Sequence, residues 1–351
     1  VRVCLLLFLF FSLLLIIHNS IPYLRPNPTI LLRIPYFEVN GSNGSFTRIH
    51  KSLLQFSFDD HRRGNMGPRG LRILFIAKRK RPSLFCLFND QKEVEGTWYE
   101  LNENHKRKYG VYVLSCPVPY ITPHIRTFRI TASKKGWLSR ELSVDYVIPE
   151  KEPNEFRMEY AICSSLVFGK KYKREHLIEF VEMNKLMGAQ IISLYVDYSS
   201  VDKQFIEAVR FYQRQGILDA VGFHAPVKRI WYHGQLAMVM DCLVRHSAVT
   251  RFVAFHDLDE FIVVPNGKKV VDVLPEYLYH NIISLRVSTQ LMSIRNDTRP
   301  MILSNVAADG TPNDKFTKCI VKPFHVFEQG IHPTSRTIFD SNRMEKAESQ
   351  I

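Results

Sequence analysis

Three carboxylates interrupt an apolar stretch in the second half of the chain. Asp257, Asp259 and Glu260 follow the apolar residues 252–255, and apolar residues resume at 261–264. Burying a carboxylate is costly unless it is paired or bound to a metal, so this position indicates a cation. If the backbone coils after the strand, Asp257 and Asp259 offer the hard oxygen ligands that Mg²⁺ and Mn²⁺ accept. The alternative is a solvated turn, which is common for Asp-x-Asp pairs.

The residues before these carboxylates alternate between strand and helix patterns. Strands are expected at residues 158–167, 191–196, 217–223 and 251–256, and helices at residues 174–187, 201–215 and 234–246. Such alternation predicts an α/β fold with a mainly parallel sheet and helices on both faces. Ligands bind beyond the carboxyl ends of the strands in open sheets of this kind. Asp257 and Asp259 are expected at that edge.

The apolar run at residues 3–17 contains one polar residue, Ser12. It is short for a membrane-spanning helix and also suits a signal peptide. Because no small-x-small cleavage site follows, we expect an uncleaved signal-anchor transmembrane segment over residues 1–19, with the rest of the chain in the lumen. A cleaved signal peptide is the alternative.

Two segments separate this anchor from the α/β pattern. Residues 20–70 contain scattered prolines and a Gly-Ser stretch, which predict a flexible stem. N-glycosylation sequons begin at Asn40, Asn43 and Asn296, as is typical of a lumenal protein. Short extended runs separated by turn residues predict a small antiparallel β domain over residues 71–150. A carbohydrate-binding role and a spacer role are both open for it.

The chain has 351 residues and a formal net charge of +13, with basic clusters at residues 78–81 and 170–174. A basic face can bind nucleic acid, anionic lipid or a phosphate-bearing substrate. The sequence contains no zinc-finger spacing, P-loop or Gly-rich dinucleotide fingerprint, and the secretory features argue against a nucleic-acid partner.

Five cysteines lie beyond the apolar run: Cys86, Cys116, Cys163, Cys242 and Cys319. Pairing is expected in an oxidising lumen, although the sequence leaves the connectivity open. Cys86 with Cys116 would staple the β domain, and Cys163 with Cys242 the α/β domain.

Between residues 157 and 332 the chain resembles glycosyltransferase family 92, whose members are type II membrane enzymes with a GT-A (Rossmann-like) fold. The matching pieces are Tyr160-Ala161-Ile162-Cys163, Tyr195-Val196-Asp197, Gln235-Leu236-Ala237 through Cys242, residues 255–261, residues 318–323 and Gly330-Ile331-His332. No single piece is specific, but the pieces match the family in order and spacing over about half the chain. The resemblance implies a catalytic domain at residues 155–351 and a single-pass Golgi membrane protein with this domain in the lumen.

The resemblance also implies a reaction. A hexose, expected to be galactose, passes with inversion from a UDP-sugar to a glycan acceptor on a glycoprotein or glycolipid, with Mn²⁺ or Mg²⁺ as cofactor. Carried over by position, Asp257 contacts the metal or the nucleotide and Asp259 binds the metal. Asp197 is a candidate donor contact, and so is Lys318, with a surface lysine beside a strand as the alternative. His332 is a candidate third metal ligand, with an idle turn histidine as the alternative.

Inversion needs a general base for the acceptor hydroxyl, and Glu260 and Glu328 are the candidates, each with a structural role as the alternative. Phosphatases of the haloacid-dehalogenase type also place Asp-x-Asp at a strand end, but there the motif opens the domain. A membrane-anchored relative without catalysis stays open, because family members usually continue further beyond the position of His332. A carboxyl-terminal truncation of the domain is therefore expected.

Overall fold

The computed structural model describes residues 46–338 except 50, 65–68, 89–92, 120–121, 123, 133–137, 280 and 293–307. These described residues belong to one compact unit. The predicted anchor at residues 1–19 and the three sequons lie outside the described residues. Within the described part of the chain, no helix is long and apolar enough to cross a membrane.

The amino-terminal half is built from two sheets. The first has the order β1-β2-β3-β7-β6, with β10 paired in parallel to β2. Its strands are β1 (Thr47–Ile49), β2 (Ser52–Asp60), β3 (Gly70–Lys78), β6 (Thr97–Glu100), β7 (Tyr109–Pro117) and β10 (Tyr146–Ile148). The second has the order β5-β4-β8-β9: β4 (Phe85–Leu87), β5 (Val94–Glu95), β8 (Thr127–Thr131) and β9 (Leu142–Ser143). A disulfide between Cys86 and Cys116 joins the two sheets.

Strands β1 and β2 lie in the segment that the sequence predicts as a flexible stem. This prediction is wrong for residues 47–60, because β2 pairs with β1 and β3 and buries Leu54, Phe56 and Phe58. Burial of these large apolar side chains outweighs the effect of the prolines and glycines on either side of them in the sequence.

The carboxyl-terminal half contains a mixed sheet with the order β13-β12-β11-β14-β16-β15. These strands are β11 (Met158–Val167), β12 (Ile191–Val196), β13 (Leu218–Gly222), β14 (Thr250–His256), β15 (Ser284–Met292) and β16 (Ala308–Val321). The first four in the sheet order are parallel, whereas β16 is antiparallel to both β14 and β15. Three of the five strand pairings are therefore parallel and two, those made by β16, are antiparallel, so the sheet is mixed where the sequence predicts a mainly parallel one.

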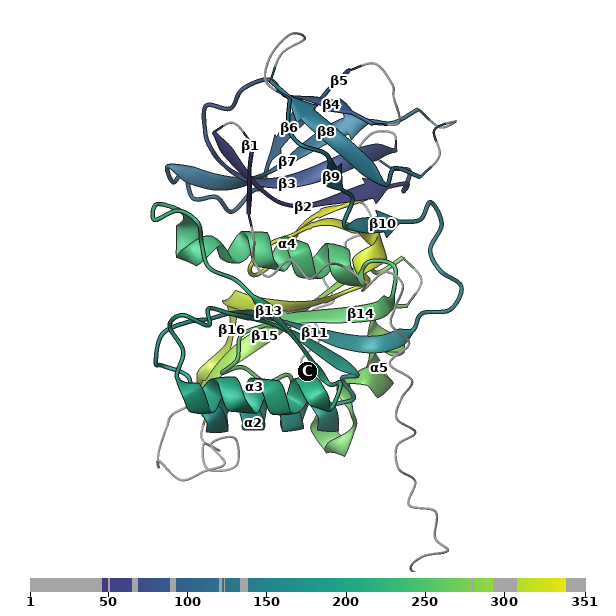
Figure 1. Cartoon of the computed structure of the whole chain (residues 1–351). Helices are drawn as coiled ribbons and strands as arrows, with labels where there is room; N and C mark the ends of the chain where they lie inside the picture. The colour runs from purple at the N-terminus through teal and green to yellow at the C-terminus, as the bar shows by residue number, and fades with distance from the viewer. Residues whose placement is uncertain are drawn as a thin grey trace, which may run out of the picture. The chain divides into compact units, whose positions relative to one another are not determined.

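Helices cover both faces of this sheet (Figure 1). On one face lie α2 (Arg174–Leu186), α3 (Lys203–Arg214) and α5 (Val270–Tyr277), whose apolar residues share one core with the strands. On the other lies α4 (Gln235–His246), preceded by η1 (Trp231–Gly234) and buried along its whole length. The chain also forms η2 (Pro265–Gly267), η3 (Pro323–His325), β17 (Val326–Gln329) and β18 (Thr334–Thr337). A disulfide between Cys163 and Cys242 ties β11 to α4.

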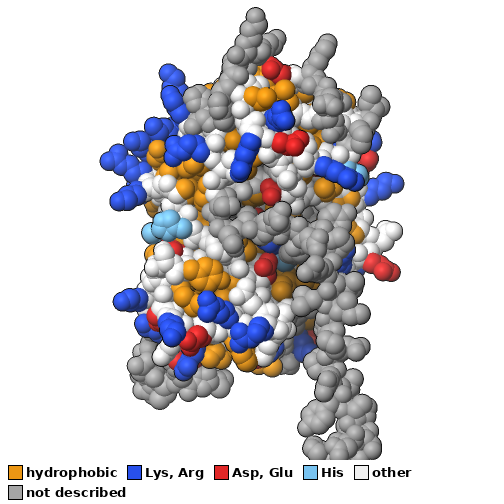
Figure 2. Space-filling model, viewed as in Figure 1, with side chains coloured by type: hydrophobic (Ala, Val, Ile, Leu, Met, Phe, Trp, Pro, Cys, Tyr) orange, Lys and Arg blue, Asp and Glu red, His pale blue; other side chains and the backbone are white. Residues whose placement is uncertain are grey.

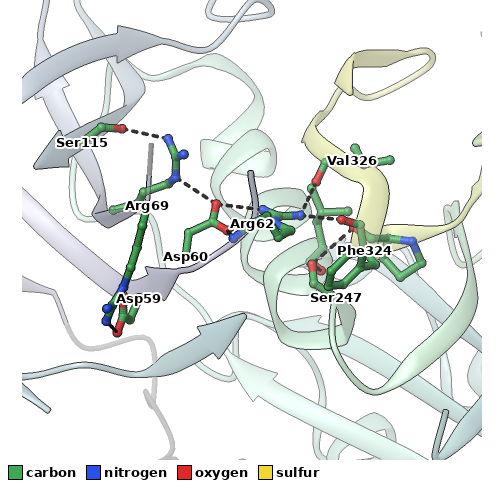
Figure 3. Close-up of polar contacts among 11 residues, drawn as sticks. Asp59, Asp60, Arg62, Arg69, Ser115, Ser247, Phe324 and Val326 are labelled. Atoms are coloured by element: carbon green, nitrogen blue, oxygen red, sulfur yellow. Dashed lines mark hydrogen bonds and ion pairs between the residues drawn. The ribbon is translucent and has the colours of Figure 1, made fainter. Parts of the chain in front are cut away.

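A buried polar cluster connects the end of β2 to the segment after β16 (Figure 3). Asp60 accepts hydrogen bonds from Arg62 at 2.8 and 3.0 Å and from Arg72 at 2.8 Å. Arg62 also donates to the carbonyl oxygens of Phe324 and Val326, at 2.8 and 3.1 Å. Burial opposes ionisation of Asp60, but the two guanidinium groups outweigh it and lower the pKa of the carboxyl. The cluster fixes the chain that follows β16 against the amino-terminal sheet.

Candidate active site

Asp257 is partly buried at the carboxyl end of β14. Parallel pairing sets Ser164 of β11 opposite His256. The register between β11 and β12 shifts between Ser164 and Leu166, so Ser165 lies in an irregularity of the strand. Such bulges re-aim side chains next to active sites, and here the Ser165 hydroxyl donates a short hydrogen bond to Oδ1 of Asp257.

Lys318 reaches the same edge from the antiparallel strand β16. Cys319 pairs with Phe255, so Lys318 lies beside the end of β14. Its Nζ is 2.9 Å from Oδ2 of Asp257 and 3.0 Å from Oε2 of Glu260, and its side chain is only 7% exposed. One buried ammonium group is therefore shared by two carboxylates.

A tight turn separates the two aspartates. The Glu260 amide donates to the Asp257 carbonyl at 3.1 Å, and the Asp257 amide donates to Oε2 of Glu260 at 2.8 Å. Leu258 points into the core, whereas Asp259 is 40% exposed and pairs with Lys171 at 2.8 Å. The chain does bend after β14, but the two aspartates contact different partners.

The charges of this group depend on each other. Burial opposes ionisation of Asp257, but Lys318 and Ser165 favour it and lower the pKa of the carboxyl. Burial and the nearby charge of Asp257 raise the pKa of Glu260. Burial disfavours the Lys318 ammonium, but the two carboxylates outweigh this and raise its pKa. Two carboxyls with pKa values pushed in opposite directions are a common arrangement in acid–base catalysis.

A small pocket opens beside Asp257. Its walls come from the end of β11, from α4, from the end of β14, from β16 and from the segment after β17. They are formed by Cys163, Ser164, Ser165, Gln235, Met238, Val239, Cys242, Phe255, His256, Asp257, Lys318 and Ile331. The disulfide between β11 and α4 is part of the wall. The covalent link therefore holds together two elements that form the pocket.

Asp197 directly follows β12 at the same edge of the sheet. Its Oδ1 accepts hydrogen bonds from the amide of Ser199 at 3.1 Å and from its hydroxyl at 2.6 Å, and its Oδ2 lies 3.1 Å from Nδ1 of His224. Burial opposes ionisation, but Ser199 and His224 outweigh it and lower the pKa of Asp197. Strand β11 separates β12 from β14, so Asp197 and Asp257 follow strands on either side of it.

His332 lies beside β16. Its Nδ1 is 3.3 Å from the Thr317 carbonyl oxygen, and its ring packs edge-on against Phe316 with centroids 5.7 Å apart. In the described part of the chain, the groups of three metal-ligating side chains within 4.8 Å of one another do not include His332 with Asp257 and Asp259. The structure thus places His332 next to the strand that carries Lys318, without joining it to the aspartates.

Glu328 is fully buried on β17. It accepts hydrogen bonds from the Tyr99 hydroxyl at 2.5 Å and from the Asn102 amide at 2.7 Å. Burial raises its pKa. Through these two hydrogen bonds, Glu328 joins β17 to the amino-terminal sheet.

Sequence reasoning did not single out Ser165, Lys171 or His224. Ser165 lies within a largely apolar strand. Lys171 belongs to the basic run at residues 170–174, which is typical of a solvated surface. Each acquires its partner only when distant strand ends meet at one edge of the sheet.

Comparison with known proteins gives consistent matches. The family model for glycosyltransferase family 92 matches residues 158–351. A β-1,4-galactosyltransferase of Caenorhabditis elegans is 30% identical over 310 residues, covering 84% of this chain and 72% of that protein. A galactan β-1,4-galactosyltransferase of Arabidopsis thaliana is 24% identical over 241 residues, covering 64% of this chain and 46% of that protein.

Among solved structures, the apo structure of the bifunctional glycosyltransferase WbbM matches 52% of this chain and 35% of its own, with 10% identity and a TM-score of 0.27. A likeness at this level does not define the fold. The family match, by contrast, includes β11, β14 and β16, the strands that position Ser165, Asp257 and Lys318. Because this match extends over more than half of its residues, the chain belongs to glycosyltransferase family 92.

Proposed function

We propose that the protein transfers galactose, with inversion, from UDP-galactose to a glycan acceptor, using a GT-A fold and a divalent cation. One observation carries the proposal: Asp257 lies between Ser165 and Lys318 where β14 ends. This is the edge at which open α/β sheets bind their ligands. The choice of galactose is supported by the two relatives, both of which are galactosyltransferases by name.

The donor atoms near this edge are of the types that Mn²⁺ and Mg²⁺ accept, although among the described residues Asp257, Asp259 and His332 do not form one group of ligands. Asp257 and Asp259 offer hard carboxylate oxygens, and His332 offers a nitrogen that Mn²⁺ accepts more readily than Mg²⁺ does. The Thr317 carbonyl can only accept, so Nδ1 of His332 carries the hydrogen and Nε2 is the nitrogen suited to a metal. When bound, such a cation acts as a Lewis acid that neutralises the leaving diphosphate.

The remaining side chains act on the donor and the acceptor. Lys318 holds a fixed positive charge where the leaving diphosphate gains negative charge, and this kind of stabilisation is usually the largest catalytic contribution. We assign Asp197, which directly follows β12, to donor binding. Glu260 is the candidate general base, because its raised pKa suits a group that takes a proton from the acceptor hydroxyl.

We further propose that the protein is a single-pass type II Golgi membrane protein with this domain in the lumen. The disulfides Cys86–Cys116 and Cys163–Cys242 support an oxidising compartment. Protease treatment of intact microsomes tests the topology: the folded part should be protected, and its digestion would contradict a lumenal location.

Release of UDP tests the activity. The purified full chain is incubated with UDP-galactose, UDP-glucose and UDP-N-acetylgalactosamine, with and without a chelator. We expect release to be fastest from UDP-galactose and to stop with the chelator. Release that persists with the chelator would contradict the metal requirement. Donor binding without release from any sugar nucleotide would identify a relative that has lost catalysis.

A further inference from the structure

Two loops that are far apart in the sequence form a basic groove, lined by Lys106, Arg107, Lys108, Lys228, Arg229, Ile230, Trp231 and Tyr232. Its volume is about 630 Å³, within the range of roughly 300–1,000 Å³ that ligand pockets occupy. Five of the eight lining residues are cationic and none is acidic. Figure 2 shows Lys and Arg side chains gathered at the upper left of the face in view.

The cations of the basic groove are available to a ligand. All five are exposed. In the parts of the chain that the structure describes, no ion pair engages them. Such a concentration of like charge opposes folding through self-repulsion. An anionic partner would relieve this repulsion, whereas the described contacts of the five cations give them no structural counter-charge.

The two loops are fixed to each other rather than merely adjacent. The Tyr109 amide donates to the Arg229 carbonyl at 3.2 Å. The Arg107 guanidinium lies 4.8 Å from the centroid of the Trp231 ring. The ring centroids of His105 and Trp231 are 4.1 Å apart. These contacts hold the guanidinium and the indole in place before any ligand arrives, which lowers the entropic cost of binding.

Backbone strain occurs in both loops. His105 and Lys106 have φ of 48° and 53°, and Tyr232 and His233 have φ of 36° and 55°. Residues other than glycine adopt this left-handed region rarely, and those that do are concentrated at ligand sites. Tyr232 occupies one of these strained positions, and its side chain is 55% exposed.

The basic groove is close in the chain to the candidate active site. Trp231 and Tyr232 belong to η1, which runs directly into α4, and Gln235 of α4 lines the pocket beside Asp257. Phe168, just after β11, packs against His233 with ring centroids 4.1 Å apart. The groove therefore borders the edge of the sheet at which Asp257 lies.

We propose that the basic groove binds an acidic carbohydrate, a glycan that carries sulfate, phosphate or carboxylate groups. Guanidinium groups bind such oxyanions through paired hydrogen bonds, and aromatic rings offer apolar faces to the sugar. A concave site suits an oligosaccharide better than a flat membrane surface. The choice of a carbohydrate over a nucleic acid rests on the proposed function.

Calorimetric titration of the full chain with a heparin hexasaccharide, without any sugar nucleotide, tests the proposal. The triple variant Arg107→Gln/Lys228→Gln/Arg229→Gln should bind at least 10-fold more weakly, which is about 1.4 kcal/mol. The matched control is Lys203→Gln/Arg210→Gln/Arg214→Gln, which removes the same charge from exposed positions on α3. Its affinity should change less than 2-fold. Thermal unfolding of both variants verifies that they are folded.

Three outcomes would overturn the proposal: equal weakening in the control, equal affinity for the desulfated hexasaccharide, or tighter binding to phosphatidylserine vesicles or to single-stranded DNA than to the hexasaccharide. Galactose transfer is measured separately as UDP release, which the groove variant should leave unchanged. Loss of hexasaccharide binding with normal UDP release would support the groove, and hexasaccharide binding without any UDP release would contradict only the proposed transfer.

Discussion

Lys318 holds together the carboxylates of the candidate active site. Its ammonium group lies within 3.0 Å of both Asp257 and Glu260 and is nearly inaccessible to solvent. Without it, two partly buried carboxylates would face each other, and removing one partner of a buried ion pair leaves an uncompensated charge. The residue thus has an electrostatic role in the unliganded protein as well as the proposed one toward the diphosphate.

Lys318→Met is therefore expected to lower kcat/KM for UDP-galactose by about 100-fold or more, the size of effect seen when one preorganised charge-stabilising group is lost. The matched control is Lys171→Met, which removes an ammonium from the exposed pair with Asp259. Exposed pairs contribute little, so its kcat/KM should fall only a few-fold. Equal losses in both variants would show that Lys318 has no special role.

Metal affinity should distinguish Asp259 from His332. We expect Asp259→Ala to abolish Mn²⁺ binding in the presence of UDP, and His332→Ala to weaken it roughly 10-fold, about 1.4 kcal/mol. A higher Mn²⁺ concentration should then rescue UDP binding by the histidine variant alone. Calorimetry measures both affinities, and an unchanged Mn²⁺ affinity in folded His332→Ala would remove this residue from the site.

At the scale of elements, the antiparallel strand β16 and the segment after it determine where the basic side chain lies. The segment is held by Arg62, which donates to the carbonyls of Phe324 and Val326 and pairs with Asp60 (Figure 3). Strand β2 therefore supports, from the other half of the protein, the strand that carries Lys318. Because the charges of this cluster are buried, loss of Asp60, Arg62 or Arg72 would leave an uncompensated charge and loosen the segment after β16.

We expect Asp60→Asn to lower the free energy of unfolding by about 3–5 kcal/mol at pH 7, because Arg62 and Arg72 lose their buried counter-charge. The folded-state pKa of Asp60 is lowered, so its stabilisation is present above the unfolded pKa of about 3.9 and is lost as the pH falls through the folded value. The difference between wild type and variant should shrink in acid.

Urea unfolding between pH 3 and pH 7 measures this. Glu150→Gln is the control, because Glu150 pairs with Arg63 on the surface, where the two side chains are 44% and 61% exposed. It should change stability by less than about 1 kcal/mol. A constant difference between wild type and Asp60→Asn at all pH values would contradict the ionised state of Asp60.

At the scale of the whole molecule, two disulfides restrict the unfolded chain and join elements that are distant in sequence. Cys163 and Cys242 are 79 residues apart and connect β11 to α4 across the pocket wall. Cys319 is buried and unpaired. A cross-link that closes a longer loop removes more entropy from the unfolded state.

Cys163→Ala/Cys242→Ala is expected to lower the free energy of unfolding by about 4.5 kcal/mol, from the loop-entropy relation. Because the bond also holds the pocket wall, UDP binding should weaken in the same variant. Chemical unfolding and calorimetry measure the two effects, with Cys86→Ala/Cys116→Ala as the control. That variant should lose stability but keep its UDP affinity, and a loss of affinity in both would show that the effect on the site is not local.

The sequence by itself determined the order of strands and helices from residue 158 to residue 256, and the position of Asp257 at a strand end. These follow from the periodicity of apolar residues and from the cost of burying a carboxylate, which are both local properties. The two disulfide pairs were also the ones that the order of the predicted domains suggested.

Tertiary structure alone decided which side chains meet. It placed β16 antiparallel to β14 and so brought Lys318 to Asp257, it gave Asp259 a separate partner, and it showed Glu328 as a buried acceptor for Tyr99. It also added β2, which the sequence pattern placed in a flexible stem, to a sheet of the predicted β domain. The physical reason is that strand pairing and charge burial depend on contacts between residues tens to hundreds of positions apart, which no local pattern records.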